Sequence, residues 1–538
     1  MRVQARSHRG DSTRATWLVL LLVALVALQL GVHGASASVV KANATGVQRG
    51  VLQGTLRALV GERSGGGGPG YRELYLRTLD ARVYALDLPP STPGAPPRAA
   101  AAAPGDAVEV TFDGGAADSS GGRHGRRTLL LDHQPRPLGS VGRGRHLQQA
   151  PSGAPTAPKG PVRMLVYIMD LSECGTAGPA VTPDEVRAFL GGGAGGANMA
   201  GLYDACTLGT TTLDAAGSVV VSVPFPCDGV LADGTRFSTD TCAGGNVLSW
   251  QLFAEEAARA QGVAALESFH HRVVILPRRL HDVIQDCYFD ALASQGIWDY
   301  VNDPSGRNTW GYGFVWMCGD CWDSTANYWH ELGHNYGVEH ARSEAPPLLG
   351  DTLDTADAMG SWGGQDSRCH NAPHLWTMGW STPAGTLAGL RPGLPPRLVS
   401  MPLQGIATPG VTGILLSPTA PSAGSSGSSG AAAGGSFVAS FRAASPPYDV
   451  PFGLTTQLST GVALHRVPSG VKYTDTALVA ILGAVGDEWT DAGSLLSVTL
   501  VSLTPRSATV AVCVRAAAGS PCYELGGALE GGAQEGEC

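Results

Sequence analysis

His330–His340 reads HELGHNYGVEH, and this stretch decides most of what the sequence predicts about fold and site. On an α-helix, residues four positions apart share one face, so His330 and His334 can present two imidazoles to one metal ion. Gly337 can turn the chain sharply because glycine tolerates positive φ, and that turn brings His340 round as a third ligand. We therefore predict a metal site formed by His330, His334 and His340.

The ligand set predicts a catalytic zinc site. Three neutral imidazoles leave the fourth position of a tetrahedral zinc ion open for water, whereas structural zinc sites are closed. Zinc lowers the pKa of that water to about 7, and Glu331, beside the first ligand, is placed to take its proton. We predict Zn2+ as the cofactor and Glu331 as the catalytic residue. The alternative, a helix that carries histidines by chance, does not explain five fixed positions within eleven residues.

The first residues predict a secretory signal peptide over residues 1–37. Basic residues up to Arg14 precede an apolar stretch from Trp17 to Leu30, and Ala35-Ser36-Ala37 fits an A-x-A cleavage site. The apolar stretch, at about fourteen residues, is short for a bilayer span, so we expect no stable membrane span. An uncleaved membrane anchor is the alternative. The sequon Asn43-Ala-Thr45 predicts an N-glycan on Asn43.

Residues 38–158 predict a pro-region. Runs at 51–60, 73–86 and 107–112 are rich in β-branched and aromatic residues, which favours a small β-rich unit. A Gly-, Arg- and Pro-rich linker follows from residue 113 to residue 159 and offers several arginines to proteases.

The chain of 538 residues is too long for one compact core, and two further domains are expected after the pro-region. Residues 159–392 predict an α/β domain, because short apolar runs alternate with helical stretches. Its active-site helix is expected to begin near Ser324 and to end near Tyr336. A helix at 252–260 is expected to turn Glu255 toward solvent. Short runs separated by turn residues predict a β-sandwich over 393–538.

Charge and cysteines are unevenly distributed. Residues 1–163 hold 20 Lys and Arg against 10 Asp and Glu, a balance of +10, and residues 164–538 hold 16 against 35, a balance of −19. These opposite charges favour association of the two parts or cationic partners for the acidic part, and the alternative is two independently solvated surfaces. All 11 cysteines lie at or after Cys174, which predicts disulfides in a secreted chain, with one cysteine left over. We predict a structural bridge between Cys318 and Cys321, because no thioredoxin-like pattern surrounds them.

The pattern HExxHxxGxxH resembles that of the metzincin metallopeptidases, and the resemblance implies that residues 159–392 form a catalytic α/β domain with a twisted mixed sheet and an active-site helix. These proteins place a methionine in a tight turn beneath the metal, and Met359, in Asp357-Ala-Met-Gly360, suits that role better than Met378.

Within the metzincins the chain resembles the gametolysin family of green-algal matrix metalloproteinases. The resemblance is carried by the Cys318-x-x-Cys321 strand end, by Tyr328-Trp-His-Glu-Leu-Gly-His-Asn335 and by Asn371-Ala-Pro-His374, and it extends over residues 162–466. It implies a secreted zinc endopeptidase that hydrolyses peptide bonds in hydroxyproline-rich glycoproteins of a cell wall or extracellular matrix. The partner expected is thus a protein substrate and no nucleic acid.

Many metzincin zymogens are silenced by a cysteine of the pro-region, but residues 1–173 contain none. Latency would then come from another ligand or from steric and electrostatic blocking. The residues that could supply such a ligand are His124, Asp132, His133 and His146. The opposite charges of the two parts favour blocking, which high salt should relieve.

A second function remains open from the sequence, namely a non-catalytic matrix-binding glycoprotein with a structural metal site. Glu331 argues against it, because a binding module has no need of a carboxylate between two metal ligands.

Overall fold

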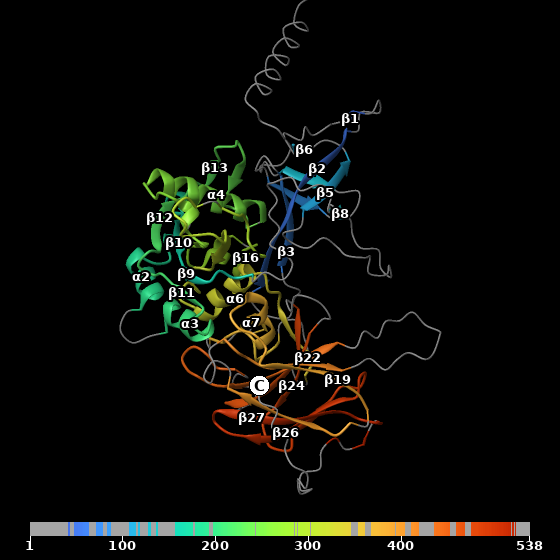
Figure 1. Cartoon of the computed structure of the whole chain (residues 1–538). Helices are drawn as coiled ribbons and strands as arrows, with labels where there is room; N and C mark the ends of the chain where they lie inside the picture. Colours follow the sequence, from blue (N-terminus) through green and yellow to red (C-terminus); the bar gives the residue numbers. More distant parts are fainter. Residues whose placement is uncertain are drawn as a thin grey trace, which may run out of the picture.

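The computed structural model describes the strands between Lys41 and Pro137 and, with short gaps, residues 156–522. The longest gaps after residue 156 are 346–352, 361–366, 404–409, 419–434, 452–458 and 468–474. The predicted signal peptide, Asn43 and Cys538 lie outside the described residues. The described chain has an N-terminal group of strands, a central α/β part and a C-terminal group of strands (Figure 1).

A mixed sheet forms the centre of the α/β part. β10 (Met164–Asp170) runs parallel to β12 (Val219–Pro224) on one side and to β15 (His271–Ile275) on the other. β17 (Gly313–Met317) continues the sheet parallel to β15, and β16 (Phe289–Ser294) follows antiparallel to β17. These strands are continuous apolar runs because helices cover both faces of the sheet. The predicted mixed α/β character of this part is confirmed.

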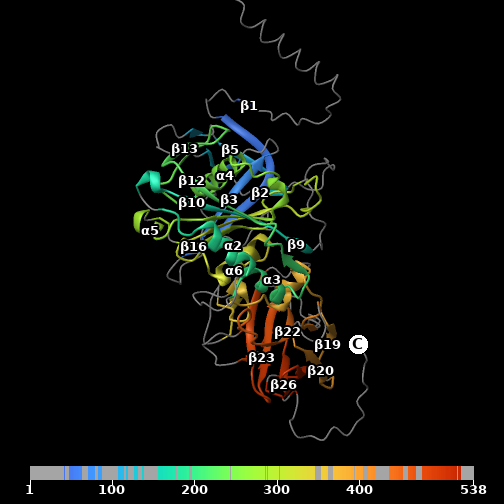
Figure 2. The same cartoon turned by 90° about the vertical axis from the view of Figure 1, so that its left-hand side faces the viewer.

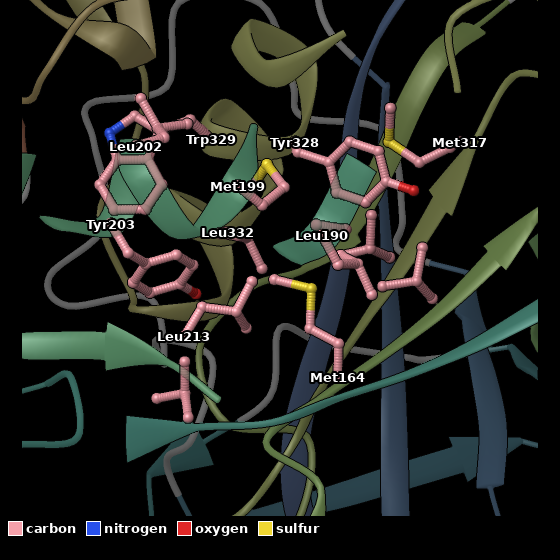
Figure 3. Packing of buried hydrophobic residues seen from close by; sticks show 14 of the residues in the cluster. Met164, Leu190, Met199, Leu202, Tyr203, Leu213, Met317, Tyr328, Trp329 and Leu332 are labelled. Carbon is pink, nitrogen blue, oxygen red and sulfur yellow. The ribbon is translucent and has the colours of Figure 1, made fainter. Parts of the chain in front are cut away.

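Alternate side chains of β10 enter two separate cores. Met164, Val166 and Ile168 join the core beneath the helices α2 (Pro183–Gly191), α3 (Met199–Cys206), α6 (Thr325–Asn335) and α7 (Ala372–Met378). Leu165 and Tyr167 join the core on the opposite face, under α4 (Gly244–Ala260). Figure 3 shows Tyr328, Trp329 and Leu332 of α6 in the first core, together with Met164 and Met199. Packing on the sheet therefore fixes the position of α6.

Smaller elements complete the central part. They are β9 (Gly160–Val162), η1 (Ser172–Cys174), β11 (Thr211–Leu213), β13 (Asp228–Val230), β14 (Arg236–Ser238), η2 (Leu266–Ser268), α5 (Leu280–Val283) and η3 (Ala358–Gly360). Among the residues that the structure describes, no helix has the length and apolar character needed to cross a membrane.

The expectation that Glu255 faces solvent is wrong. Its side chain on α4 is buried, and its carboxylate lies 2.7 Å from Nη1 of Arg272 on β15. Arg272 is itself buried, and its guanidinium lies over the Tyr312 ring. A buried cation requires a nearby anion, so the charge on the strand places Glu255 on the inner face of the helix.

The N-terminal runs form strands, as predicted from their composition. β2 (Gln48–Arg63) pairs antiparallel with β3 (Tyr71–Thr78) and with β5 (Ala107–Asp113), and β3 pairs with β4 (Val83–Asp87). The short strands are β1 (Lys41–Ala42), β6 (Ala117–Asp118), β7 (Arg127–Leu130) and β8 (Arg136–Pro137). The end of β2 also pairs with β16, which joins this unit to the central sheet. In Figures 1 and 2 the long β2 and β3 extend from the N-terminal unit toward that sheet.

The C-terminal strands form two sheets over one hydrophobic core. The six-stranded sheet has the order β18-β24-β23-β22-β21-β19, and the four-stranded sheet has the order β20-β27-β26-β25. The bounds are β18 (Ala341–Ser343), β19 (Gly385–Leu390), β20 (Arg397–Pro402), β21 (Ile414–Pro418), β22 (Ser436–Ala443), β23 (Thr460–Val467), β24 (Thr476–Leu482), β25 (Glu488–Thr490), β26 (Leu496–Leu503) and β27 (Ser507–Val514). β18 and β19 come from the residues predicted for the α/β domain, 159–392. The C-terminal sheet therefore includes strands from that range.

Ten cysteines form five disulfides in the described chain, namely Cys174–Cys227, Cys206–Cys369, Cys242–Cys287, Cys318–Cys321 and Cys513–Cys522. The predicted bridge between Cys318 and Cys321 is present. Cys206–Cys369 ties α3 to the segment that leads into α7, and it closes a loop of 163 residues.

Candidate metal centre

Helix α6 begins where the sequence predicts. The side chain of Ser324 accepts a hydrogen bond from the backbone N–H of Asn327, so it satisfies one of the amides that a helix start leaves without an intrahelical partner. The helix ends at Asn335, and Gly337 follows at φ 82°, a left-handed conformation that glycine adopts without strain. The predicted sharp turn at this glycine is confirmed.

The structure brings His330, His334 and His340 together. Their ring centroids lie 4.8–5.2 Å apart, and their ligand atoms all lie within 4.8 Å of one another. His330 donates its Nδ1–H to the Ala358 carbonyl at 2.9 Å, and His334 donates its Nδ1–H to the Val338 carbonyl at 3.2 Å. These bonds fix the tautomers, so that both Nε2 atoms keep a lone pair for a metal.

The donor set fits a zinc ion. Zinc–nitrogen distances of about 2.0–2.1 Å in a tetrahedron place two ligand nitrogens roughly 3.3 Å apart. Nε2 of His334 and Nε2 of His340 are 3.1 Å apart. Burial lowers the pKa of His334 well below its usual value, and His340 and His330 lower it further, so this ring is neutral, as a metal ligand must be. Glu331 lies on the same helix beside His330, and its side chain is 2 % exposed.

A buried hydrogen-bond network holds the end of α6. The amide of Asn335 donates to the carbonyls of Ser294 and Phe314, each at 3.0 Å, so that it ties the helix to β16 and β17. Its Oδ1 therefore accepts from Nδ1 of His271 at 3.0 Å, and Nε2 of His271 accepts from the Tyr336 hydroxyl at 3.0 Å. Burial lowers the pKa of His271 to about 3, which keeps this ring neutral. The network orients the last turn of α6, which carries His334.

Met359 lies directly against α6, the helix that carries His330 and His334. It is fully buried in η3, and a β-carbon added at Gly333 would overlap its sulfur. The preceding Asp357 holds this turn, because its carboxylate accepts from the backbone N–H of Met359 at 2.5 Å and of Asn371 at 2.6 Å. This turn also supplies the Ala358 carbonyl, which orients the His330 ring.

Two histidines flank Asp357. Nδ1 of His374 lies 2.9 Å from one carboxylate oxygen, and Nδ1 of His370 lies 3.6 Å from the other. Burial raises the pKa of Asp357, but His374 and His370 outweigh that effect and hold it well below its usual value. These three residues could themselves reach one metal ion. Because both carboxylate oxygens already accept backbone hydrogen bonds, we interpret the group as a support of the turn.

The C-terminal strands contribute to the site, which the sequence did not predict. Arg442 of β22 is buried and donates to the carbonyls of Ala356 and Cys369. Nε2 of His465, on β23, lies 2.9 Å from a carboxylate oxygen of Asp354. Both contacts hold the segment around the Met359 turn from the side of the C-terminal sheet. For Arg442, the sequence signal is an arginine that directly follows the apolar run at residues 437–441.

The residues that could supply a latency ligand, His124, Asp132, His133 and His146, lie outside the described residues.

A helix bearing HExxH, a glycine turn to a third histidine and a buried methionine turn beneath them define a site of the metallopeptidase type. Comparison with known proteins agrees: residues 163–405 match the family model described as gametolysin peptidase M11. The resemblance to the gametolysin family that the sequence motifs carry is thereby confirmed. The chain is also similar to autolysin of Chlamydomonas reinhardtii, with 26% identity over 269 residues. That match covers 41% of this chain and 40% of autolysin, so this chain aligns with less than half of its relative's length.

Proposed function

We propose that this protein is a secreted zinc endopeptidase of the metzincin type that cleaves hydroxyproline-rich glycoproteins of a cell wall or extracellular matrix. The observation that carries the proposal is the convergence of His330, His334 and His340 beside the buried Glu331. The match of residues 163–405 to the M11 family supports the peptidase class. Five disulfides support an oxidising compartment, as secretion requires.

His330, His334 and His340 would hold the zinc ion, which supplies a Lewis acid that acidifies water and polarises a carbonyl. Glu331 acts as the general base: its carboxylate takes a proton from the attacking water and delivers it to the leaving amine. The carbonyls of Ala358 and Val338 keep two of the ligand rings in the tautomer that binds metal. Met359 and Asp357 keep the floor of the site rigid.

The same proposal includes an assignment of each part of the chain. We assign residues 1–37 to a signal peptide, 38–158 to a pro-region, 159–392 to the peptidase domain and 393–538 to a β-sandwich, with an N-glycan on Asn43. The earlier segments β18 and β19 also contribute strands to the sandwich. The two C-terminal sheets over one core support the sandwich.

Cleavage of wall glycoproteins by the processed protein and by Glu331→Ala tests the function. We expect the variant to retain its zinc and to lose about 10²–10⁴-fold in rate, as loss of a general base does. Absence of cleavage by a fully processed, zinc-loaded wild type would instead favour the matrix-binding glycoprotein. Fragment sequencing with and without a chelator identifies the cleaved bonds.

A further inference from the structure

The third proposed ligand, His340, lies outside the helix that carries the other two. α6 ends at Asn335, and the chain turns at Gly337 before it reaches His340. Packing of α6 on the central sheet therefore fixes His330 and His334. The position of the third imidazole depends in addition on what holds the chain after this turn.

The chain after His340 is held by the C-terminal six-stranded sheet. Ala341 begins β18, which runs parallel to β24 as the edge strand of that sheet, and Ala341 lies opposite Thr476. Just beyond β18, the backbone N–H of Glu344 donates to the carbonyl of Leu478 at 2.7 Å. The pairing begins one residue after His340, so it determines where this ligand lies relative to α6. In Figures 1 and 2, α6 lies in the region of the central part that faces the C-terminal strands.

The same sheet holds the segment that leads into the methionine turn. The backbone N–H of Asp354 donates to the carbonyl of Ala341 at 3.3 Å, and the buried Asp354 carboxylate lies 2.9 Å from Nε2 of His465 on β23. Leu478 of β24 forms a small buried cluster with Ala356, against which the segment just after β18 also packs. The Leu478 side chain therefore joins the end of β18 to the segment before the turn.

We propose that the C-terminal six-stranded sheet is part of the zinc site, in which β24 positions His340 through its pairing with β18 and Leu478 is a positioning residue. This role of the sheet rests on the proposed peptidase function, because it concerns the same three histidines. The match to the family model ends at residue 405, so β24 (Thr476–Leu482) lies outside it. The zinc-binding unit then comprises the predicted peptidase domain together with strands of the predicted β-sandwich.

Two leucine variants of the full chain test this role. Leu478→Ala removes the side chain that packs on Ala356, whereas Leu482→Ala, the matched control, removes a leucine of the same strand from the core between the two C-terminal sheets. The two side chains are 2% and 3% exposed, so both variants open a cavity and should unfold at a lower urea concentration. We expect only Leu478→Ala to weaken zinc binding, by about 10–100-fold in chelator competition.

Leu478→Met keeps the volume of the side chain and should restore the zinc affinity to within about threefold of the wild type. Equal weakening of zinc binding by Leu478→Ala and Leu482→Ala would show a general loss of structure and would overturn the proposal. Unchanged affinity in Leu478→Ala would overturn it as well.

A double-variant cycle with the third ligand shows whether Leu478 acts through His340. His340→Ala should itself weaken zinc binding, because it removes a ligand. In the His340→Ala background, Leu478→Ala should weaken zinc binding by less than about threefold, because the group that it positions is already absent. A full 10–100-fold loss in that background would overturn the positioning of His340 by the sheet.

Cleavage of a short fluorogenic peptide by the processed wild type separates this role from the peptidase function. Absence of cleavage, together with the expected pattern of zinc affinities, would uphold the role of the sheet and overturn the peptidase function. Cleavage by the wild type, together with equal zinc affinities of the wild type and Leu478→Ala, would overturn the role of the sheet and uphold the function.

Discussion

Replacing Gly333 by alanine probes the contact between α6, which carries His330 and His334, and the turn that contains Met359. A β-carbon at this position would overlap the sulfur of Met359 and lie 2.9 Å from Cε1 of His370, closer than ordinary van der Waals contact. Met359 is fully buried, so its side chain has no open space to retreat into. The substitution therefore forces a shift in the floor of the metal site.

The magnitude follows from two opposing effects. Alanine is more favourable than glycine inside a helix by about 1 kcal/mol, whereas overpacking a core costs about 1–3 kcal/mol. We expect Gly333→Ala to lower the free energy of unfolding by about 0–2 kcal/mol. Met359→Ala alone should cost about 2–5 kcal/mol, because it leaves a cavity. The double variant should be about 1–3 kcal/mol more stable than the sum of the two effects, because the new methyl group fills the space left by the sulfur.

Urea unfolding of the wild type, both single variants and the double variant measures this coupling. Met378 on α7 is the matched control, since it is equally buried but is not among the atoms nearest to Gly333. Gly333→Ala and Met378→Ala should be additive within about 0.5 kcal/mol. The assignment of Met359 as the methionine beneath the metal would be refuted if the effects of Gly333→Ala and Met359→Ala were additive. It would also be refuted if Gly333→Ala were coupled more strongly to Met378→Ala than to Met359→Ala.

Three further outcomes are expected. The pKa of His271 is about 3 in the folded chain and about 6.5 in the unfolded chain, so the unfolded chain takes up the proton first as the pH falls. In the presence of a chelator, the free energy of unfolding should therefore decrease below pH 6.5 and be lower by about 2 kcal/mol at pH 5. A His271→Gln variant with the same pH dependence of stability would contradict this. Asp357→Asn should weaken zinc binding about 10–100-fold in chelator competition while the far-ultraviolet circular dichroism stays unchanged, and an unaltered affinity would exclude a positioning role. Replacing Cys206 and Cys369 by serine should cost about 2–5 kcal/mol in unfolding experiments, because the bridge closes a loop of 163 residues; a loss below about 1 kcal/mol would show that the bridge does not constrain the unfolded chain.

The parts of the site that the sequence predicted are those that depend on local geometry. His330 and His334 share a helix face through their spacing, Gly337 turns the chain because of its backbone freedom, and Ser324 caps the helix through its own side chain. Each of these features depends on residues within one or two turns. A local pattern is enough to find them.

The features that the sequence did not predict depend on distant partners. Glu255 is buried because Arg272 lies on the strand beneath it, and nothing within its own helix indicates that partner. Arg442 contacts the carbonyls of Ala356 and Cys369, on either side of the methionine turn, and these residues lie 86 and 73 positions from it in the chain. The pairing of β2 with β16 likewise joins strands from parts of the chain that were predicted as separate units. Hydrophobic periodicity identifies strands, but it does not determine which edges meet.

X-ray absorption at the zinc edge of the folded, zinc-loaded protein tests the central claim most directly. Three imidazole nitrogens at about 2.0–2.1 Å plus one oxygen from solvent are expected, because His330, His334 and His340 leave one position open. His340→Ala should reduce the imidazole count to two. A shell of four protein ligands closed to solvent, or one unchanged in His340→Ala, would contradict the assignment of these three histidines to a catalytic zinc site.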